Sequence, residues 1–433
     1  MTNRTRTLRY VHPDEVRTNP TNPRKHPKAQ VRALAKSIEA FGFNAPILVD
    51  RSMQILAGHG RLEAAKLLKL TLVPIVGLDD LNEAQARAYM LADNKLTDRS
   101  SWDEPLLATH LKELSALSVD FDIEATGFEM PEVDLLIQSM DGDSTDAEDE
   151  FELATDPAVT QPGDIWLLSD HVIVCGSSRD PATYARLPEG CQPTAVFADP
   201  HYNVPINGHV SGLGKIKHRE FAEGVGEMSP EAFTSFLADI QRLATAQAAD
   251  DALQFWCMDW RHMGEMLEAS RTCALDLVNL CVWVKTNAGM GGFYRSRHEL
   301  VFVLGKPGQP HRNNVQLGRF GRNRTNVWNY PGANVPSAKK TLQYHPTPKP
   351  VGLVADALQD CTARGDHVLD PFLGSGTTLL AAERTGRRAW GIELDPLYVD
   401  TAILRWQKMT KGHARLQGSG QTFAEVKAGR VAS

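Results

Sequence analysis

The tetrapeptide Asp199–Tyr202 (DPHY) carries groups that could do chemistry on an aromatic amine. The apolar run before it, residues 195–198, predicts a strand that delivers these side chains into a loop. An aromatic amine is a poor nucleophile, because the lone pair of its nitrogen is delocalised into the ring. A carboxylate (Asp199) and a backbone carbonyl (Pro200) could accept both amine hydrogens, while the ring of Tyr202 could stack on a base swung out of a duplex. For these four residues alone, an ordinary Asp-Pro turn after a strand is the commoner explanation, so the prediction depends on a second site.

A second group of residues, 367–396, has the pattern of a nucleoside-binding turn. An apolar strand enters a turn with Gly374 and Gly376, a helix follows, and a second strand ends at Glu393. Glycines let the backbone approach a ligand closely, and an acid 19 residues after the first glycine can bind ribose hydroxyls. The turn lacks the third glycine that seats a pyrophosphate and the lysine of a phosphate-binding loop, which disfavours a dinucleotide. A plain strand, turn and helix without a ligand is the alternative.

The elements between these two sites determine whether they can meet. After residue 163, short apolar runs that predict strands alternate with helical stretches. Such alternation is typical of an α/β fold, here a Rossmann-like, doubly wound and mostly parallel sheet with helices on both faces. Ligands of such sheets bind at the carboxyl ends of the strands. We therefore expect the loops of Asp199 and Gly374, 175 positions apart, to lie at the same edge of one sheet.

Because the first motif precedes the second, residues 163–410 resemble the beta group of DNA amino-methyltransferases. Asp199–Tyr202 is similar to their D-P-P-Y, residues 372–378 to their F-x-G-S-G-T-T, and residues 344–350 (YHPTPKP) to the segment before the cofactor motif. The resemblance implies transfer of a methyl group from S-adenosylmethionine to the amino group of a flipped base in double-stranded DNA. It assigns catalysis to Asp199, Pro200, His201 and Tyr202, and cofactor binding to Asp370, Phe372, Gly374, Ser375, Gly376, Thr377 and Glu393, with Lys349 nearby.

The target base follows from finer features of the same motifs. An aspartate rather than a serine at position 199 is typical of the adenine enzymes of this family, so N6 of adenine is the predicted target and N4 of cytosine the alternative. His201 replaces the second proline of the family motif, which affects the fit of the base. No Pro-Cys dipeptide occurs, so the usual nucleophile for methylation of cytosine C5 is absent. Residues 203–228 and 306–343 are the predicted readers of the DNA sequence, because they are Gly-rich or basic and lie outside the predicted sheet.

The first 100 residues predict a smaller α+β domain. Residues 28–41 have the apolar spacing of a helix, and Gly42 follows where that helix would be capped. The segment NPRKHP (22–27) and the run LAGHGRLEAAKLL resemble the ParB and sulfiredoxin fold. This resemblance implies a phosphate or nucleoside triphosphate site at the helix start, formed by Gly58, His59, Gly60 and Arg61.

Other roles for this domain stay open. It could serve only to place the chain on DNA or to form a homodimer, and the whole chain could be a ParB-like DNA- or nucleotide-binding protein whose methyltransferase half is silent. Sulfiredoxin chemistry is excluded, because it needs a cysteine in this domain and the first cysteine of the chain is Cys175.

Charge is unevenly distributed along the chain. The net charge is −7, but residues 141–152 alone carry seven acids and no base, so the remainder is neutral. This acidic stretch has too few apolar residues to form a core and predicts a linker over 141–162, after a helical connector at 101–140. Residues 306–324 carry five Lys or Arg and no acid. They predict contacts with DNA phosphates through Arg312, Arg319, Arg322 and Arg324, a solvated basic loop being the alternative.

The predicted methyltransferase domain spans 163–412, and a flexible tail is expected at 413–433. The six cysteines show no CxxC pair and no Cys/His spacing suited to zinc, so neither a disulfide frame nor a metal site is expected. No apolar run is long enough to span a bilayer, and the first ten residues lack the apolar stretch of a secretory signal. These features predict a cytoplasmic protein.

Overall fold

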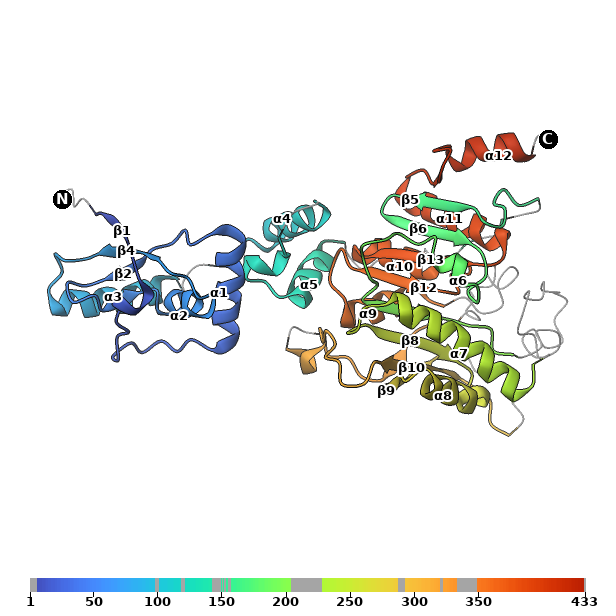
Figure 1. Cartoon of the computed structure of the whole chain (residues 1–433), viewed down its shortest axis with the longest axis horizontal. Helices are drawn as coiled ribbons and strands as arrows, with labels where there is room; N and C mark the ends of the chain where they lie inside the picture. Colours follow the sequence, from blue (N-terminus) through green and yellow to red (C-terminus); the bar gives the residue numbers. More distant parts are fainter. Residues whose placement is uncertain are drawn as a thin grey trace. The chain divides into compact units, whose positions relative to one another are not determined.

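The computed structural model divides into two compact units, Met1–Met140 and Asp141–Ser433 (Figure 1). None of the helices in its described part combines the length and the apolar composition that a membrane span requires. The structure describes residues 6–97, 101–117, 121–141, 149, 151, 153–154, 157–203, 228–286, 293–319, 322–332 and 349–431.

The first unit is built around a four-stranded sheet with the strand order β1-β4-β2-β3. β2 runs parallel to β4, whereas β1 and β3 are antiparallel to their neighbours. Ile47, Ile55, Leu62 and Ile75 are buried between this sheet and its helices. The α+β class and the helix over 28–41 are as predicted. The elements are Leu8–Val11 (β1), Pro13–Glu15 (η1), Lys28–Phe41 (α1), Ile47–Val49 (β2), Ile55–Ala57 (β3), His59–Leu67 (α2), Val73–Gly77 (β4) and Glu83–Thr97 (α3).

The segment predicted as a helical connector belongs to this first unit. It contains Glu104–Ala116 (α4), Ile123–Thr126 (η2) and Met130–Asp141 (α5). The Lys36 ammonium on α1 donates to Glu124 at 2.8 Å and to Asp122 at 3.3 Å, which fixes η2 against α1. The rings of Phe41 and Phe121 pack edge to face beside this ion pair, with centroids 5.0 Å apart. These contacts attach the segment to the α+β fold.

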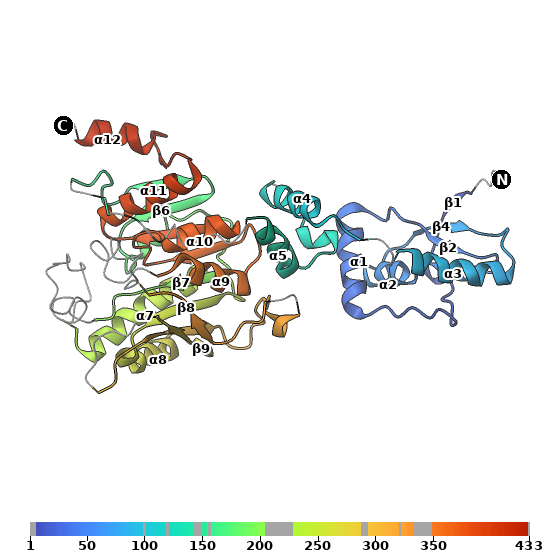
Figure 2. The same ribbon diagram turned by 180° about the vertical axis from the view of Figure 1, so that it is seen from behind.

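The second unit contains a ten-stranded sheet with the strand order β11-β9-β10-β8-β7-β12-β13-β6-β5-β14 (Figure 1, Figure 2). Its centre, β8-β7-β12-β13-β6, is parallel, while β10 runs antiparallel between β8 and β9. From the adjacent pair β7 and β12 the chain proceeds in opposite directions, through β8 and through β13. This pair is therefore a topological switch point, where open parallel sheets bind ligands. The strands are Ile165–Leu168 (β5), His171–Cys175 (β6), Ala195–Ala198 (β7), Leu253–Met258 (β8), Asp276–Val284 (β9), His298–Gly305 (β10), Val327–Asn329 (β11), His367–Asp370 (β12), Arg388–Glu393 (β13) and Arg415–Leu416 (β14).

Helices cover both faces of this sheet (Figure 1, Figure 2). Phe197 of β7 belongs to an apolar cluster with α9, α10 and α11, whereas its neighbours Val196 and Ala198 belong to a second cluster with α7 and α8. Successive side chains of a strand point to opposite faces, so the two clusters are the two sides of one sheet. The predicted doubly wound α/β fold is confirmed. The helices are Pro181–Tyr184 (α6), Pro230–Gln247 (α7), Trp260–His262 (η4), Met263–Thr272 (α8), Gln316–Gly318 (η5), Val351–Cys361 (α9), Thr377–Thr385 (α10), Pro396–Thr410 (α11) and Phe423–Val431 (α12).

The end of the chain is packed in place of the flexible tail that its composition predicts. β14 pairs with β5, and Phe423 at the start of α12 is buried with its ring 5.4 Å from that of Trp166. The end of the predicted linker is also fixed, because the backbone amides of Val159 and Thr160 both donate to the carboxylate of Asp400. Apolar side chains at helical spacing in an otherwise polar segment explain the order at the C-terminal end.

Candidate active site

The two predicted motifs lie at the carboxyl ends of adjacent parallel strands. β7 pairs with β12 in parallel register, Asp199 directly follows β7, and Asp370 is the last residue of β12. Lys349 connects the two loops: its ammonium donates to Oδ2 of Asp199 at 2.7 Å, and its carbonyl accepts from the Thr377 hydroxyl at 3.4 Å. The structure therefore brings together residues that are far apart in the sequence.

The Asp199 carboxylate is held from both sides. Oδ2 accepts from Lys349, and Oδ1 accepts from the Tyr202 hydroxyl at 2.8 Å. Burial raises the pKa of Asp199 above its ordinary value, and the Lys349 ammonium opposes this effect. Two carboxylate oxygens offer about four acceptor positions, so the held group can still accept a further hydrogen.

Two charged residues at this site were not predicted from the sequence. Glu299, at the start of β10, is only 6% exposed and lies with Oε2 3.1 Å from the Lys349 ammonium. Its other oxygen accepts from Lys285, directly after β9. Burial would raise the pKa of Glu299, but Lys349 and Lys285 outweigh it and lower the pKa to about 2. An acid directly before the apolar residues 300–304 of β10 was the available signal, since a buried charge needs a partner.

Lys349 is the more deeply buried of the two lysines at the site. It is 5% exposed, and its ammonium lies 5.4 Å and 5.7 Å from the ring centroids of Tyr202 and Trp283. Burial would lower the pKa of Lys349, but Asp199 and Glu299 outweigh it and raise the pKa above its ordinary value. The lysine is thus a fixed positive charge between two carboxylates.

Two carboxyl groups border the predicted cofactor turn. Oδ1 of Asp370 accepts from the Phe372 amide at 2.8 Å, and Oε2 of Glu393 accepts from the Gly374 amide at 2.8 Å. Burial raises the pKa of each carboxyl group to about 7, against the hydrogen bonds that favour the ionised forms. Gly376 directly precedes α10 with φ +89°, and a Cβ there would lie 2.7 Å from Cβ of Ala402. The turn can therefore follow this close path only with glycine.

The remaining predicted residues lie around the same turn. Ser375 is buried, and its carbonyl accepts from Arg405 at 2.8 Å. Pro200 is buried, and the His201 ring packs edge to face on Phe372 with centroids 6.1 Å apart. All predicted catalytic and cofactor residues are thus gathered at the ends of β7, β12 and β13.

Three protein families match parts of the chain. Residues 1–95 match the ParB N-terminal domain, residues 105–162 the ParB-methyltransferase HTH domain, and residues 194–404 the DNA methylase family. The chain carries a ParB N-terminal domain and a DNA methylase domain. The helix-turn-helix match does not follow from the sequence pattern, which indicates a connector and a linker over those residues.

Individual relatives are similar over part of the chain. The Type II methyltransferase M.ScaI of Streptomyces caespitosus is 36% identical over 103 residues, covering 23% of this chain and 33% of that protein. The putative methylase YubD of Escherichia coli (strain K12) is 31% identical over 146 residues, covering 33% and 57%. The chain thus spans between a third and three fifths of the length of these two relatives. A putative DNA modification methylase from Thermus thermophilus, solved with S-adenosyl-L-methionine, aligns over 56% of this chain and 96% of that one, with 24% identity and a TM-score of 0.40.

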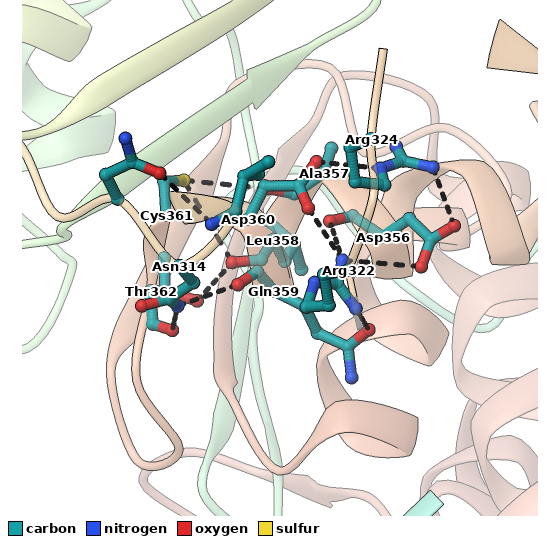
Figure 3. A network of polar contacts seen from close by, with 12 residues as sticks. Asn314, Arg322, Arg324, Asp356, Ala357, Leu358, Gln359, Asp360, Cys361 and Thr362 are labelled. Atoms are coloured by element: carbon teal, nitrogen blue, oxygen red, sulfur yellow. Dashed lines mark hydrogen bonds and ion pairs between the residues drawn. The ribbon is translucent and has the colours of Figure 1, made fainter. Parts of the chain in front are cut away.

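Two of the predicted DNA-binding arginines have a structural role in the methylase domain (Figure 3). Arg322 is 7% exposed and donates to Gln359 at 3.1 Å and to Asp360 at 2.6 Å. Arg324 donates to Asp360 at 3.1 Å and to Asp356 at 3.0 Å. The acids that neutralise both guanidinium groups come from α9, outside the basic segment, so these side chains are not available to phosphates.

The other two predicted DNA-binding arginines are Arg312 and Arg319. Arg319 is exposed and Arg312 is half-buried, which leaves contact with DNA phosphates a prediction for this pair. Of the predicted sequence-reading segments, residues 204–227, 320–321 and 333–343 lie outside the described residues.

The GHGR turn of the ParB N-terminal domain starts α2. Gly58 precedes the helix with φ +107°, and His59 and Gly60 are buried in its first turn. Nε2 of His59 accepts from the Asn19 amide at 3.2 Å, so this ring supports the turn from inside. A Cβ at Gly58 would lie 3.1 Å from Nε and Nη2 of Arg61, whose guanidinium therefore folds back over the turn. Arg61 is the residue of the four that places a cation at this helix start.

Proposed function

We propose that this chain transfers a methyl group from S-adenosylmethionine to the exocyclic amino group of a flipped base in double-stranded DNA, with N6 of adenine as its target. The observation that carries the proposal is the position of Lys349, whose side chain touches Asp199 and whose backbone touches Thr377 of the cofactor turn. Amine methylation needs the acceptor for the amine and the methyl donor at one place, because nitrogen, methyl carbon and sulfur must be aligned. N4 of cytosine is the second candidate target; aspartate at position 199 favours adenine.

The residues around the glycine turn fit S-adenosylmethionine, which supplies a methyl group on a positively charged sulfur. Asp370 is buried and Glu393 is half-buried beside the turn. Two carboxyl groups would repel a phosphate and attract a cation. Glu393, at the end of β13, can accept hydrogen bonds from ribose hydroxyls.

The residues after β7 act on the target amine. Asp199 accepts one amine hydrogen and the Pro200 carbonyl accepts the other, which draws the nitrogen toward the tetrahedral geometry of the transition state. Lys349 fixes the carboxylate through its other oxygen. The Tyr202 hydroxyl shares Asp199 with the incoming amine or yields to it, and its ring stacks on the flipped base.

The substitution Asp199→Asn tests the role of this carboxylate. Loss of a charged acceptor should lower the rate of methyl transfer by about 100-fold or more, while the affinity for S-adenosylmethionine stays within about threefold of the parent. Transfer is measured with labelled cofactor and duplex DNA, and affinity by calorimetry. Nucleoside mass spectrometry of the parent's product distinguishes N6-methyladenine from N4-methylcytosine.

Asp259→Asn is the matched control for this variant. Asp259 directly follows the neighbouring parallel strand β8, where it caps η4 and pairs with Arg261. The control should keep near-normal transfer. Comparable transfer by Asp199→Asn and by the control would reject the catalytic role of Asp199.

A nucleoside triphosphate is the proposed ligand of the ParB N-terminal domain. The backbone amides at the start of α2 and the guanidinium of Arg61 present positive charge to an anion. Burial lowers the pKa of Arg61, with Asp93 opposing, but a guanidinium stays protonated throughout the physiological range. The turn is therefore suited to phosphate.

We do not assign contacts with the DNA backbone to residues 105–162, which match the helix-turn-helix family. Residues 105–162 carry fifteen acids and one base, Lys112. A segment of this charge repels phosphates, whereas binding to the duplex requires cations that release its counterions. Contacts with DNA are therefore assigned to the methylase domain, with Arg312 and Arg319 as the candidates.

A further inference from the structure

The proposed reaction site contains a charge cluster of four residues: Asp199, Lys349, Glu299 and Lys285. This cluster contains two acids and two bases and is neutral as a whole. Each contact joins opposite charges, from Asp199 through Lys349 to Glu299 and on to Lys285. The exposed fraction falls from the ends inward, with Asp199 and Lys285 side chains at 24% and 25% and Lys349 and Glu299 at 4% and 7%.

The buried carboxylate of Glu299 has its polar partners outside β10. Glu299 is buried opposite Trp283 of β9 and directly precedes the apolar residues 300–304 of β10, and a carboxylate in that position must be taken out of water. Its oxygens contact the two ammonium groups, and Oε2 lies 3.0 Å from the Tyr202 hydroxyl, whose single hydrogen is shared between Glu299 and Asp199. These polar contacts of the side chain are all directed at the groups around Asp199.

We propose that Glu299 is a positioning residue for methyl transfer, which separates Lys285 from Lys349 and limits the positive charge that acts on Asp199. The proposal rests on the function proposed above. In this arrangement one ammonium is shared by two carboxylates, so Asp199 is fixed by Lys349 without being fully neutralised by it. A carboxylate in that state stays basic enough to accept a strong hydrogen bond from the target amine.

The electrostatics of the cluster support this division of roles. The titratable groups that face Asp199 are Lys349, Glu299, Tyr202, Cys257 of β8 and Asp370 of β12. Burial raises the pKa of Tyr202 and of Cys257 well above their ordinary values, so both stay neutral. Glu299 raises the pKa of Asp199, and Lys349 lowers it. Removal of the Glu299 charge should therefore lower the pKa of Asp199 and weaken it as an acceptor.

Glu299→Gln removes the charge and keeps the shape and one acceptor oxygen. We expect it to lower kcat for DNA methylation by about tenfold or more and to shift the acidic limb of the pH–rate profile to lower pH. The affinity for S-adenosylmethionine should be unchanged, because the contacts of Glu299 are with the groups around Asp199 and not with the glycine turn. Glu383→Gln is the matched control. Glu383 lies near the C-terminal end of α10, is partly buried and pairs with His171, so this variant should keep the kcat and the acidic limb of the parent.

The double variant Glu299→Gln/Lys285→Met restores the charge balance. One acid and one base remain, Asp199 and Lys349, and the double variant should recover most of the rate lost by Glu299→Gln and return the acidic limb toward that of the parent. Such recovery distinguishes charge from packing, because a second buried substitution would otherwise add to the damage. A double variant no faster than Glu299→Gln, or a Glu299→Gln variant with parental kcat and acidic limb, would overturn the proposal.

A second readout does not need turnover. With ¹³C-labelled aspartate carboxyl groups, the resonance that disappears in Asp199→Asn reports the titration of Asp199 by NMR. Its midpoint should move to lower pH in Glu299→Gln and back in the double variant. If the parent protein methylates no DNA, the proposed function fails, while this titration still decides whether Glu299 controls Asp199. An unmoved midpoint in Glu299→Gln rejects the inference even if the parent is active.

Discussion

The ParB N-terminal domain and the methylase domain each lead a strand into a nine-residue helix through a left-handed glycine. Gly58 has φ +107° and Gly376 has φ +89°, and both helices begin at the next residue. The charges around the two turns are opposite. Arg61 folds over the first turn, whereas Asp370 and Glu393 border the second. The backbone conformation of the two turns is the same, so their side chains would account for the difference between the proposed ligands: an anion at the first turn and a cation with hydroxyl groups at the second.

The two turns also differ in how tightly the protein encloses them. A Cβ at Gly376 would meet the Cβ and Cα of Ala402 at 2.7 Å and 3.0 Å, while a Cβ at Gly58 would meet the end of the Arg61 side chain at 3.1 Å. The helix α11, which carries Ala402, cannot move away, but a guanidinium can. The turn before α10, the proposed cofactor turn, is thus a fixed part of a core. The turn before α2, the proposed phosphate turn, is covered by a movable group.

The largest expected effect is on stability and concerns these glycines. Gly376→Ala should lower the free energy of unfolding by about 2–4 kcal/mol, from a strained left-handed residue and an overpacked contact. Gly58→Ala, its matched partner, should cost about 1–2 kcal/mol, because mostly the left-handed strain applies. Urea denaturation of the full chain measures both. Equal losses would show that the two turns are enclosed alike.

The next effect concerns the carboxylate that distinguishes the cofactor turn. Glu393→Gln should weaken binding of S-adenosylmethionine by about 10- to 100-fold, since hydrogen bonds to a charged group contribute about 1.5–3 kcal/mol. Gln retains the shape and can still accept from the Gly374 amide. Calorimetry gives the affinity, with Glu383→Gln as the control on the same helix-strand unit. An unchanged affinity would remove Glu393 from the ribose contact.

The sequence predicts both turns well because each is local. A strand, a glycine and a helix follow one another within about twenty residues, and the position of Glu393 is fixed by the same unit. The adjacency of β7 and β12 also follows from the sequence, given the order of motifs in a doubly wound sheet. These predictions depend either on a pattern of residues that are close in the sequence or on the known topology of a doubly wound sheet.

The features that the sequence does not predict depend on distant partners. Glu299 and Lys349 are 50 positions apart and meet only because β10 lies antiparallel beside β8. The absence of acids from their own segment predicts that Arg322 and Arg324 are exposed, but Asp356 and Asp360 on α9 supply the counter-charge. Charge within a segment therefore predicts little about exposure when another element brings the opposite charge.

The third prediction concerns Arg61, the cation of the proposed phosphate turn before α2. Arg61→Gln should weaken binding of a nucleoside triphosphate by about tenfold or more, with the affinity for S-adenosylmethionine unchanged. Calorimetry of the full chain with the magnesium salts of the four ribonucleoside triphosphates gives the measurement. Lys66→Gln is the control, because Lys66 lies on the same helix and pairs with Asp14 at the surface. If none of the triphosphates binds to the parent protein, the opposite charges of the two turns do not mean that one turn binds an anion and the other a cation.

The smallest effect is the pH dependence of the cofactor turn. Burial raises the pKa values of Asp370 and Glu393 to about 7, so both groups take up protons in the folded protein at a pH where they are ionised in the unfolded chain. Without cofactor, their contribution to stability is therefore present at low pH and decreases as the pH rises toward 7. Binding of a cationic cofactor favours the ionised forms and has the opposite dependence.

The affinity for S-adenosylmethionine should accordingly increase from pH 6 to pH 8, and for a single required ionisation the change below pH 7 approaches about tenfold per pH unit. Calorimetry at several pH values in buffers of different ionisation enthalpy measures the affinity and the protons released on binding. In Glu393→Gln the affinity should depend less steeply on pH, and the remaining dependence should come from the ionisation of Asp370. The proposed phosphate turn provides the contrast. Burial lowers the pKa of His59, with His26 adding to the effect, and Arg61 stays charged, so neither His59 nor Arg61 changes its charge between pH 7 and pH 8. An affinity for S-adenosylmethionine that is independent of pH would mean that the two carboxyl groups are already ionised, and the charge contrast between the turns would then extend over the whole physiological range.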